Sequence, residues 1–157
     1  MVDALLPLDA NGRPYEGLLP FVAKKTMTFD GGTENDPGDY DGTGNPADLF
    51  TVTGDVLAIL VGVCKENLVG AATIEAGVAG ATAALLAQIA DAENLDVNEA
   101  WLDATPGLAE GFTPQPKLIG GGLDIIQTVG TANITDGTIH YYCFWMPLSD
   151  DGQVSPA

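Results

Sequence analysis

One histidine and two cysteines are the side chains of this sequence best suited to nucleophilic or metal chemistry: His140, Cys64 and Cys143. A Cys–His dyad needs the thiol within hydrogen-bond reach of the imidazole. Cys143 follows His140 by three residues in a predicted strand, so the two side chains point to opposite faces. Cys64 reaches His140 only through a favourable cross-strand register, and a zinc site needs more ligands than these three residues supply. We therefore expect no enzyme and no catalytic residue, with both thiols buried and free; a disulfide between them stays open.

A second candidate for chemistry is the acidic stretch FDGGTENDPGDYDGTGNPAD, residues 29–48. It contains no Lys or Arg and six carboxylates, at Asp30, Glu34, Asp36, Asp39, Asp41 and Asp48. Carboxylate oxygens are the ligands that Ca²⁺ prefers, but the best EF-hand register starts at Asp39 and places Phe50 where a bidentate Glu is required. We expect an exposed, mobile acidic loop over 30–48, without metal or cofactor, and a looser calcium site stays open as the alternative.

Composition and charge limit the partners. The 157 residues are 46% hydrophobic, which predicts one folded domain. Asp and Glu number 22 against 5 Lys and Arg, a formal net charge of -17. Such a surface repels phosphate, so we expect no nucleic-acid partner and no binding to anionic lipid. The longest apolar run, Val56 to Cys64, is about half the length of a membrane-spanning helix. A soluble protein is therefore predicted.

Residues 1–23 are predicted to form an extended N-terminal arm, because Pro7, Pro14 and Pro20 interrupt any regular element. The arm is too apolar to be left in water, so we expect it to lie on its own body or on a partner. Three of the five basic residues fall within the first 25 positions, which suits an acidic partner surface unless the clustering is chance. The candidate contact residues are Arg13, Tyr15, Leu18, Leu19, Phe21, Lys24 and Lys25.

Residues 24–157 are predicted to form a single β domain. Alternation places Lys25, Met27 and Phe29 on one side of a first strand. The segment from Leu49 to Asn67 reads as two strands broken at 53–55, and the second is apolar on both faces, as in a central strand covered on both sides. With further glycine-bounded runs, the chain is predicted to be an all-β, antiparallel sandwich or barrel, jelly-roll-like, of about seven or eight short strands.

Two local patterns sharpen this prediction. The segment TAALLAQIADAENLD has helix-compatible residues, but its glycine turn and neighbouring strands favour a strand, with a short helix as the alternative. Asp136-Gly137 is the dipeptide that a tight type I′ turn demands, and it lies between residues 133–135 and an aromatic run. The sequence therefore predicts a hairpin there. In the aromatic run, His140, Tyr142 and Phe144 share one face.

Several segments carry a resemblance to a known family. They are LFTVTGDVLAILVGVCKENLVG, ATIEAGVAGATAALLAQI, AWLDATP, LDIIQTVGTANITDGTIHYYCFW and MPLSDDG, spread over residues 49–152. In these segments the chain resembles small structural proteins of tailed bacteriophages. The resemblance implies a virion component, most plausibly a capsid decoration (cement) protein that sits on the outer shell as a homotrimer. It supplies no functional residues that map one by one, and it leaves out residues 1–28 and the acidic loop.

The expected function is therefore binding. A decoration protein made in the host cytoplasm would bind the major capsid protein on the outer capsid surface of the virion, and residues 1–23 would engage that protein or a neighbouring subunit. One alternative is a receptor- or carbohydrate-binding module of a head or tail fibre, in which Trp101, Tyr141, Tyr142 and Trp145 form a platform for sugar stacking. A second alternative is a tail-tube or head-completion protein.

Overall fold

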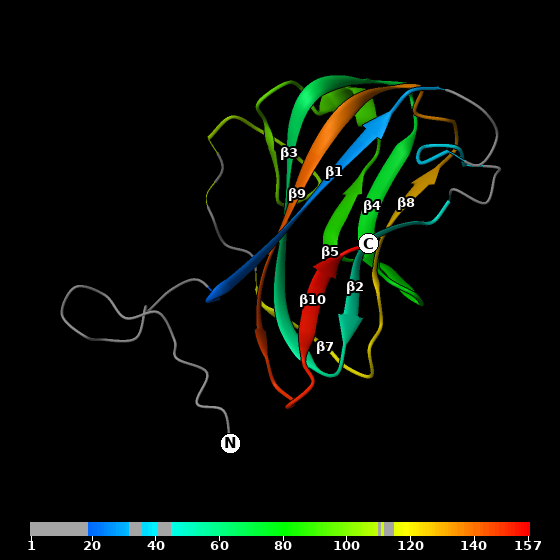
Figure 1. The fold of residues 1–157 in the computed structure, drawn as a ribbon. Coiled ribbons are helices and arrows are strands. Elements are labelled where there is room, and N and C mark those ends of the chain that lie inside the picture. The colour runs from blue at the N-terminus through cyan, green and yellow to red at the C-terminus, as the bar shows by residue number, and fades with distance from the viewer. Residues whose placement is uncertain (1–18, 32–35, 41–44, 110, 112–114) are drawn as a thin grey trace.

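Two antiparallel sheets packed face to face make the body of the protein (Figure 1). The computed structural model describes residues 19–31, 36–40, 45–109, 111 and 115–157. Within these, the first sheet holds β1 (Phe21–Phe29), β9 (Asp136–Pro147), β3 (Val56–Val69) and β6 (Ala100–Trp101) in that order, and β7 (Lys117–Ile119) also pairs with β3. The second sheet runs β10 (Gln153–Pro156), β2 (Ala47–Thr53), β8 (Ile125–Gly130), β4 (Thr73–Val78) and β5 (Ala81–Ile89).

The strand pairing is that of a jelly roll. Strands from the two ends of the chain pair first, β1 with β9 and β2 with β8, and the pairing continues inward with β3 and β7 and with β4 and β5. Successive pairs alternate between the two sheets. The predicted all-β sandwich with jelly-roll character is confirmed. The predicted strand count and length are not matched, because the described residues form ten strands, of which β3 has 14 residues and β9 has 12.

The core lies between the sheets and is filled by the inward rows of β3 and β9. Leu60 and Ile139 are among its fully buried residues, together with Trp101 of β6. Gly62 pairs with Trp101, and a Cβ added at Gly62 would lie 3.1 Å from indole Cε3. The missing side chain therefore leaves space for the indole, whose Nε1 donates a 3.0 Å hydrogen bond to the Ala87 carbonyl of β5. This bond ties one edge of the first sheet to the second.

A buried polar pair joins the sheets near their centre. The Tyr141 hydroxyl of β9 donates to Oε1 of Gln127 in β8 at 2.6 Å, and both side chains are buried. Burial raises the pKa of Tyr141 well above its usual value, so the hydroxyl stays a neutral donor. The hydrogen bond satisfies one oxygen of an amide that would otherwise be costly to bury.

The ends of the predicted arm and of the predicted acidic loop differ from those in the structure. β1 begins at Phe21, so the last three residues of the predicted arm are strand, paired with Trp145, Phe144 and Cys143. β2 begins at Ala47, so Asp48 belongs to a strand and not to the acidic loop. The predicted break at 53–55 is confirmed, and the segment that could have been helical is β5, followed by a 3-10 turn at Ala92–Asn94.

The predicted hairpin at Asp136-Gly137 is wrong. Both residues belong to β9, and the preceding residues 131–135 form no strand. Ile134 and Thr135 instead donate their backbone N–H groups to Gly38 and Val69. Gly137 has φ +113°, and a Cβ there would lie 2.6 Å from the Asn67 carbonyl oxygen. The glycine is thus needed for a close approach between β9 and β3, a requirement that looks the same in sequence as a tight turn.

Candidate functional site

The thiols and the imidazole lie on opposite sides of the first sheet. Cys64 and Cys143 are buried and free on its inner face, whereas His140 is on the outer face. Cys143 pairs with Leu60 across the two strands, four residues along β3 from Cys64. The two Cα atoms are therefore about 13 Å apart, beyond the ~7 Å that a disulfide spans. The strands do pair, but their register excludes the disulfide that the sequence left open within one chain.

The environment makes these groups weak nucleophiles and bases. Burial raises the pKa of the Cys143 thiol to about 12, and burial is also the main cause of the raised pKa of Cys64. The His140 pKa is lowered, first by desolvation and then by the charges of Lys24 and Lys65. Its imidazole is therefore mostly neutral at pH 7, and its Nδ1 has no hydrogen-bond partner among the described residues.

Residues 36–40 of the acidic loop are anchored to the body. Gly38 accepts a hydrogen bond from the Ile134 backbone at 2.9 Å, and the Tyr40 N–H donates to Oδ1 of Asn133 at 3.2 Å. Gly38 is buried and Asp36, Pro37 and Asp39 are half-buried, so the expectation of an exposed loop is wrong for these residues, whereas Tyr40 is exposed. Glu34 and Asp41 lie outside the described residues. Within those that are described, no group of three or more His, Cys, Asp or Glu residues could hold a metal ion.

The four aromatic residues proposed as a sugar platform do not meet on one surface. Trp101 and Tyr141 are fully buried core residues. Trp145 faces inward and packs against Phe21, with 4.8 Å between the ring centroids. Tyr142 alone points outward from the first sheet. The proposed platform is therefore wrong as a geometric arrangement, because alternation along β9 sends neighbouring rings to opposite faces.

The candidate contact residues of the arm have different surroundings. Arg13, Tyr15 and Leu18 lie outside the described residues. Leu19 is half-buried, and Phe21 is 40% exposed. Lys25 faces the second sheet and donates a hydrogen bond to the Ala157 carbonyl. Lys24 faces outward, with Nζ 5.7 Å from the centre of the Tyr142 ring. Alternation along β1 thus separates two adjacent lysines that the sequence grouped together.

Over part of the first sheet, the outward side chains form adjacent rows of apolar residues. This surface is here called the apolar face. In the strand register Val22, Phe144 and Ile59 make one row, and Leu57 lies between Met146 and Leu118 in the next. The face consists of Val22, Leu57, Ile59, Val61, Val63, Leu118, Tyr142, Phe144 and Met146. Val22 is 58% exposed and Leu118 68%, while Ile59 at the centre is only 5% exposed. Neighbouring side chains on a sheet shield one another, which leaves most of the others half-buried.

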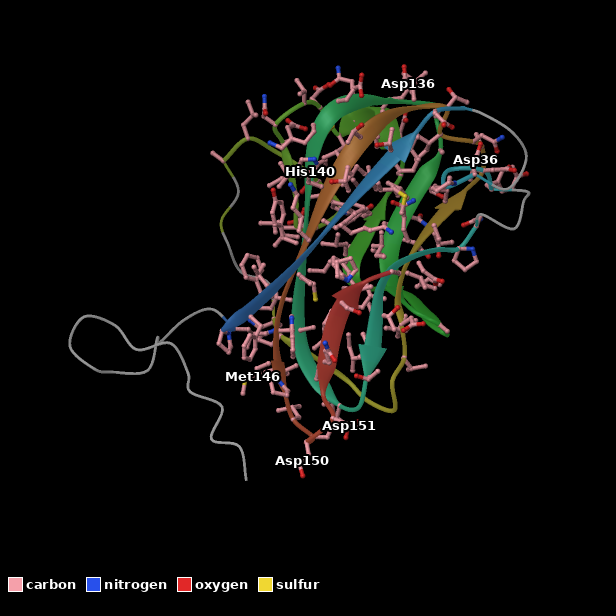
Figure 2. All side chains as sticks on the ribbon, viewed as in Figure 1. Asp36, Asp136, His140, Met146, Asp150 and Asp151 are labelled. Atoms are coloured by element: carbon pink, nitrogen blue, oxygen red, sulfur yellow. The ribbon has the colours of Figure 1, made fainter. Side chains whose placement is uncertain are left out.

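Lys24, Thr26 and His140 continue these rows toward the other end of the sheet. Lys24 pairs with Tyr142, which pairs with Val61, and Thr26 pairs with His140, which pairs with Val63. His140 and Met146, both labelled in Figure 2, lie on the outward row of β9, which continues past His140 to Thr138, whose hydroxyl donates a 3.2 Å hydrogen bond to the Glu66 carboxylate. No Asp or Glu occurs in segments 22–26, 57–63 and 140–146. The apolar face is therefore free of acidic side chains along its whole length, in a chain with 22 of them.

The outer face of the second sheet is different. Its exposed or half-buried positions carry Asp48, Thr51, Glu75, Thr128 and Ser155. Polar contacts such as the 2.8 Å hydrogen bond from the Gln88 amide to the Glu75 carboxylate cross it. Other acidic side chains lie at the two ends of the sandwich, with Asp36 and Asp136 at one end and Asp150 and Asp151 at the other (Figure 2). The two outer faces thus offer different chemistry to a partner.

The sequence pattern behind the apolar face, apolar residues on both sides of β3, was found, but its interpretation was wrong. It took the two apolar faces of β3 as a sign of burial on both sides. The structure packs the second sheet against one side only, and Leu57, Val61 and Val63 on the other side are half-buried. An apolar outward row that no second layer of described residues covers indicates a surface for contact with another molecule or segment.

Comparisons with known proteins add no further assignment. No protein-family model matches the chain, and neither the curated proteins nor the solved structures gave a match. In the part of the chain that the structure describes, no helix has the length and apolar character to cross a membrane. The candidate site therefore depends on the geometry of the apolar face alone.

Proposed function

We propose that this protein is a capsid decoration (cement) protein of a tailed bacteriophage. It binds the outer surface of the head and stabilises the shell through non-covalent contacts with the major capsid protein. It is made in the host cytoplasm and ends up on the virion, with the homotrimer as its working form. It transforms no substrate.

The observation that carries this proposal is the acid-free apolar face on a stiff two-sheet body. Binding proteins need complementary area, and the jelly-roll body presents that area on strands rather than on loops. The jelly roll alone would not suffice, because the same fold serves lectins, cupins and capsid proteins. The resemblance of segments within 49–152 to phage structural proteins supports the choice of partner.

The charge supports the same role. A net charge of -17 disfavours adhesion to DNA, which is abundant in a lysing cell. Carboxylates on the surfaces outside the apolar face would also keep decorated shells from sticking to each other. Three copies in one trimer would engage the shell together, so modest contacts per copy would add up through avidity.

The test is binding of the purified protein to empty shells of the phage that encodes it. Mass photometry of the protein alone reports its oligomeric state, and sedimentation with shells reports occupancy. We expect a trimer, saturable binding and a higher melting temperature for decorated shells. Rings of six or twelve copies without shell binding would instead favour the tail-tube or head-completion alternative.

A further inference from the structure

We infer that the apolar face is the surface that docks on the shell, and that its partner is a protein patch of apolar side chains with a carboxylate placed opposite Lys24. This inference rests on the proposed function and assigns a surface and a partner chemistry to it. It differs from the expectation for the arm, because Lys25 is turned inward and Lys24 lies at the edge of the apolar face, beside Tyr142.

The first argument is the arrangement of apolar side chains. Phe144 lies between Val22 and Ile59, and Tyr142 between Lys24 and Val61, so aromatic rings occupy the middle strand with aliphatic side chains beside them. Energetically dominant contacts in protein interfaces are enriched in such central aromatic groups with a surrounding apolar rim. The absence of Asp and Glu matches the depletion of these residues from interface cores.

The second argument is charge complementarity. Lys24 is exposed and holds its ammonium 5.7 Å from the centre of the Tyr142 ring. The charges of Lys24 and Lys65 both lower the pKa of His140, so both lysines lie near this imidazole. The two lysines thus place positive charge beside the apolar rows, at the end of the face that His140 adjoins. A partner carboxylate opposite Lys24 would gain a favourable interaction in a partly desolvated contact, whereas a basic group there would be repelled.

The same charges argue against a second copy as the occupant. Two apolar faces meeting across a two-fold axis would place the Lys24 side chains of both copies in one interface, and the face itself supplies no carboxylate to pair with them. Among the described residues, other exposed large apolar side chains such as Val97, Leu108 and Leu123 lie outside the strands and in separate connections. A different protein is the better complement.

The size of the face sets the expected strength. Six residue steps along β3 and four adjacent strands give an area of roughly 20 by 15 Å, or about 300 Å² of flat surface. This is below the ~800 Å² per partner of a standard interface, so one copy alone should bind weakly. Small changes within the face should therefore have large effects on occupancy.

The experiment compares matched substitutions on the two outer faces. Val22→Asp adds a carboxylate to an exposed strand position of the apolar face, and Thr51→Asp adds the same side chain to an exposed strand position of the second sheet. Both variants have the same net charge. Lys24→Glu reverses the charge of the face at an exposed position. Thermal unfolding checks that each variant is folded. If Val22→Asp is unfolded, the test depends on Lys24→Glu.

We expect Val22→Asp and Lys24→Glu to weaken binding to empty shells at least about tenfold, with Thr51→Asp within about twofold of the wild type. If the wild type binds shells and both Val22→Asp and Lys24→Glu bind equally well, this inference is overturned, but the proposed function still stands. A wild type that binds no shells would overturn the proposed function itself. Loss of the native oligomer in the two variants would also overturn the inference, because it would make the face a contact between copies.

Discussion

The Cys143 thiol lies in the core between Ala23 and Leu60, and burial raises its pKa from the ordinary 9.0 to about 12. A thiol that ionises more readily in the unfolded chain destabilises the folded state as the pH rises. The contribution of the protonated Cys143 thiol to the stability of the folded state is complete below pH 9, and it is lost as the pH rises from 9 to about 12. For these two pKa values the loss is about 1.4 kcal/mol at pH 10 and about 2.7 kcal/mol at pH 11.

The assay is denaturation by guanidinium chloride at pH 8, 9 and 10 under reducing conditions, for the wild type and for Cys143→Ala. The alanine variant loses packing contacts at every pH, but it has no thiol to ionise at position 143. The stability gap to the wild type should therefore shrink by about 1.3 kcal/mol between pH 8 and pH 10. Cys64→Ala is the control, because it removes one buried thiol and keeps that of Cys143. Equal pH slopes for the wild type and Cys143→Ala would refute the reasoning.

Two further predictions test the core and the apolar face. Tyr141→Phe removes the donor to Gln127 and leaves its Oε1 unpaired, so the free energy of unfolding should fall by about 1–3 kcal/mol in chemical denaturation; an unchanged value would contradict a buried hydrogen bond. The single histidine should titrate below pH 6.5 by NMR, so stability should fall as the pH drops and the unfolded chain takes up a proton first. Lys24→Gln should raise the His140 pKa, while Lys117→Gln, whose charge is not among the causes of the shift, should leave it in place; equal values in both variants would show that Lys24 is not beside the imidazole.

Much of the fold could be predicted because alternation along strands is a local property. The pattern of Met27 and Phe29 against Thr26 and Thr28 gave the inner side of β1, and the break at 53–55 separated β2 from β3. The antiparallel sandwich followed from the number of such segments. The hairpin at Asp136-Gly137 failed because positive φ at a glycine serves a tight turn and a close interstrand approach equally well.

The candidate site was harder to predict because a surface depends on register. Val22, Phe144 and Ile59 are far apart in sequence and form one row only through the pairing of β1, β9 and β3. The sequence grouped Lys24 with Lys25 by proximity along the chain, although strand geometry sends adjacent side chains to opposite faces. An apolar outward row also looks like a buried row until the second layer is located.

The segregation of charge explains how the protein could carry an apolar face without aggregating. A contiguous exposed apolar surface is an aggregation hazard in any soluble protein. Here the carboxylates are placed on the second sheet and at the ends of the sandwich, so two copies approaching in most orientations meet with like charges. A partner that binds the apolar face should therefore supply a carboxylate at the contact but carry less net negative charge around it than this protein does. A large, immobile surface that offers many such patches at fixed spacing meets this requirement better than another copy of the chain.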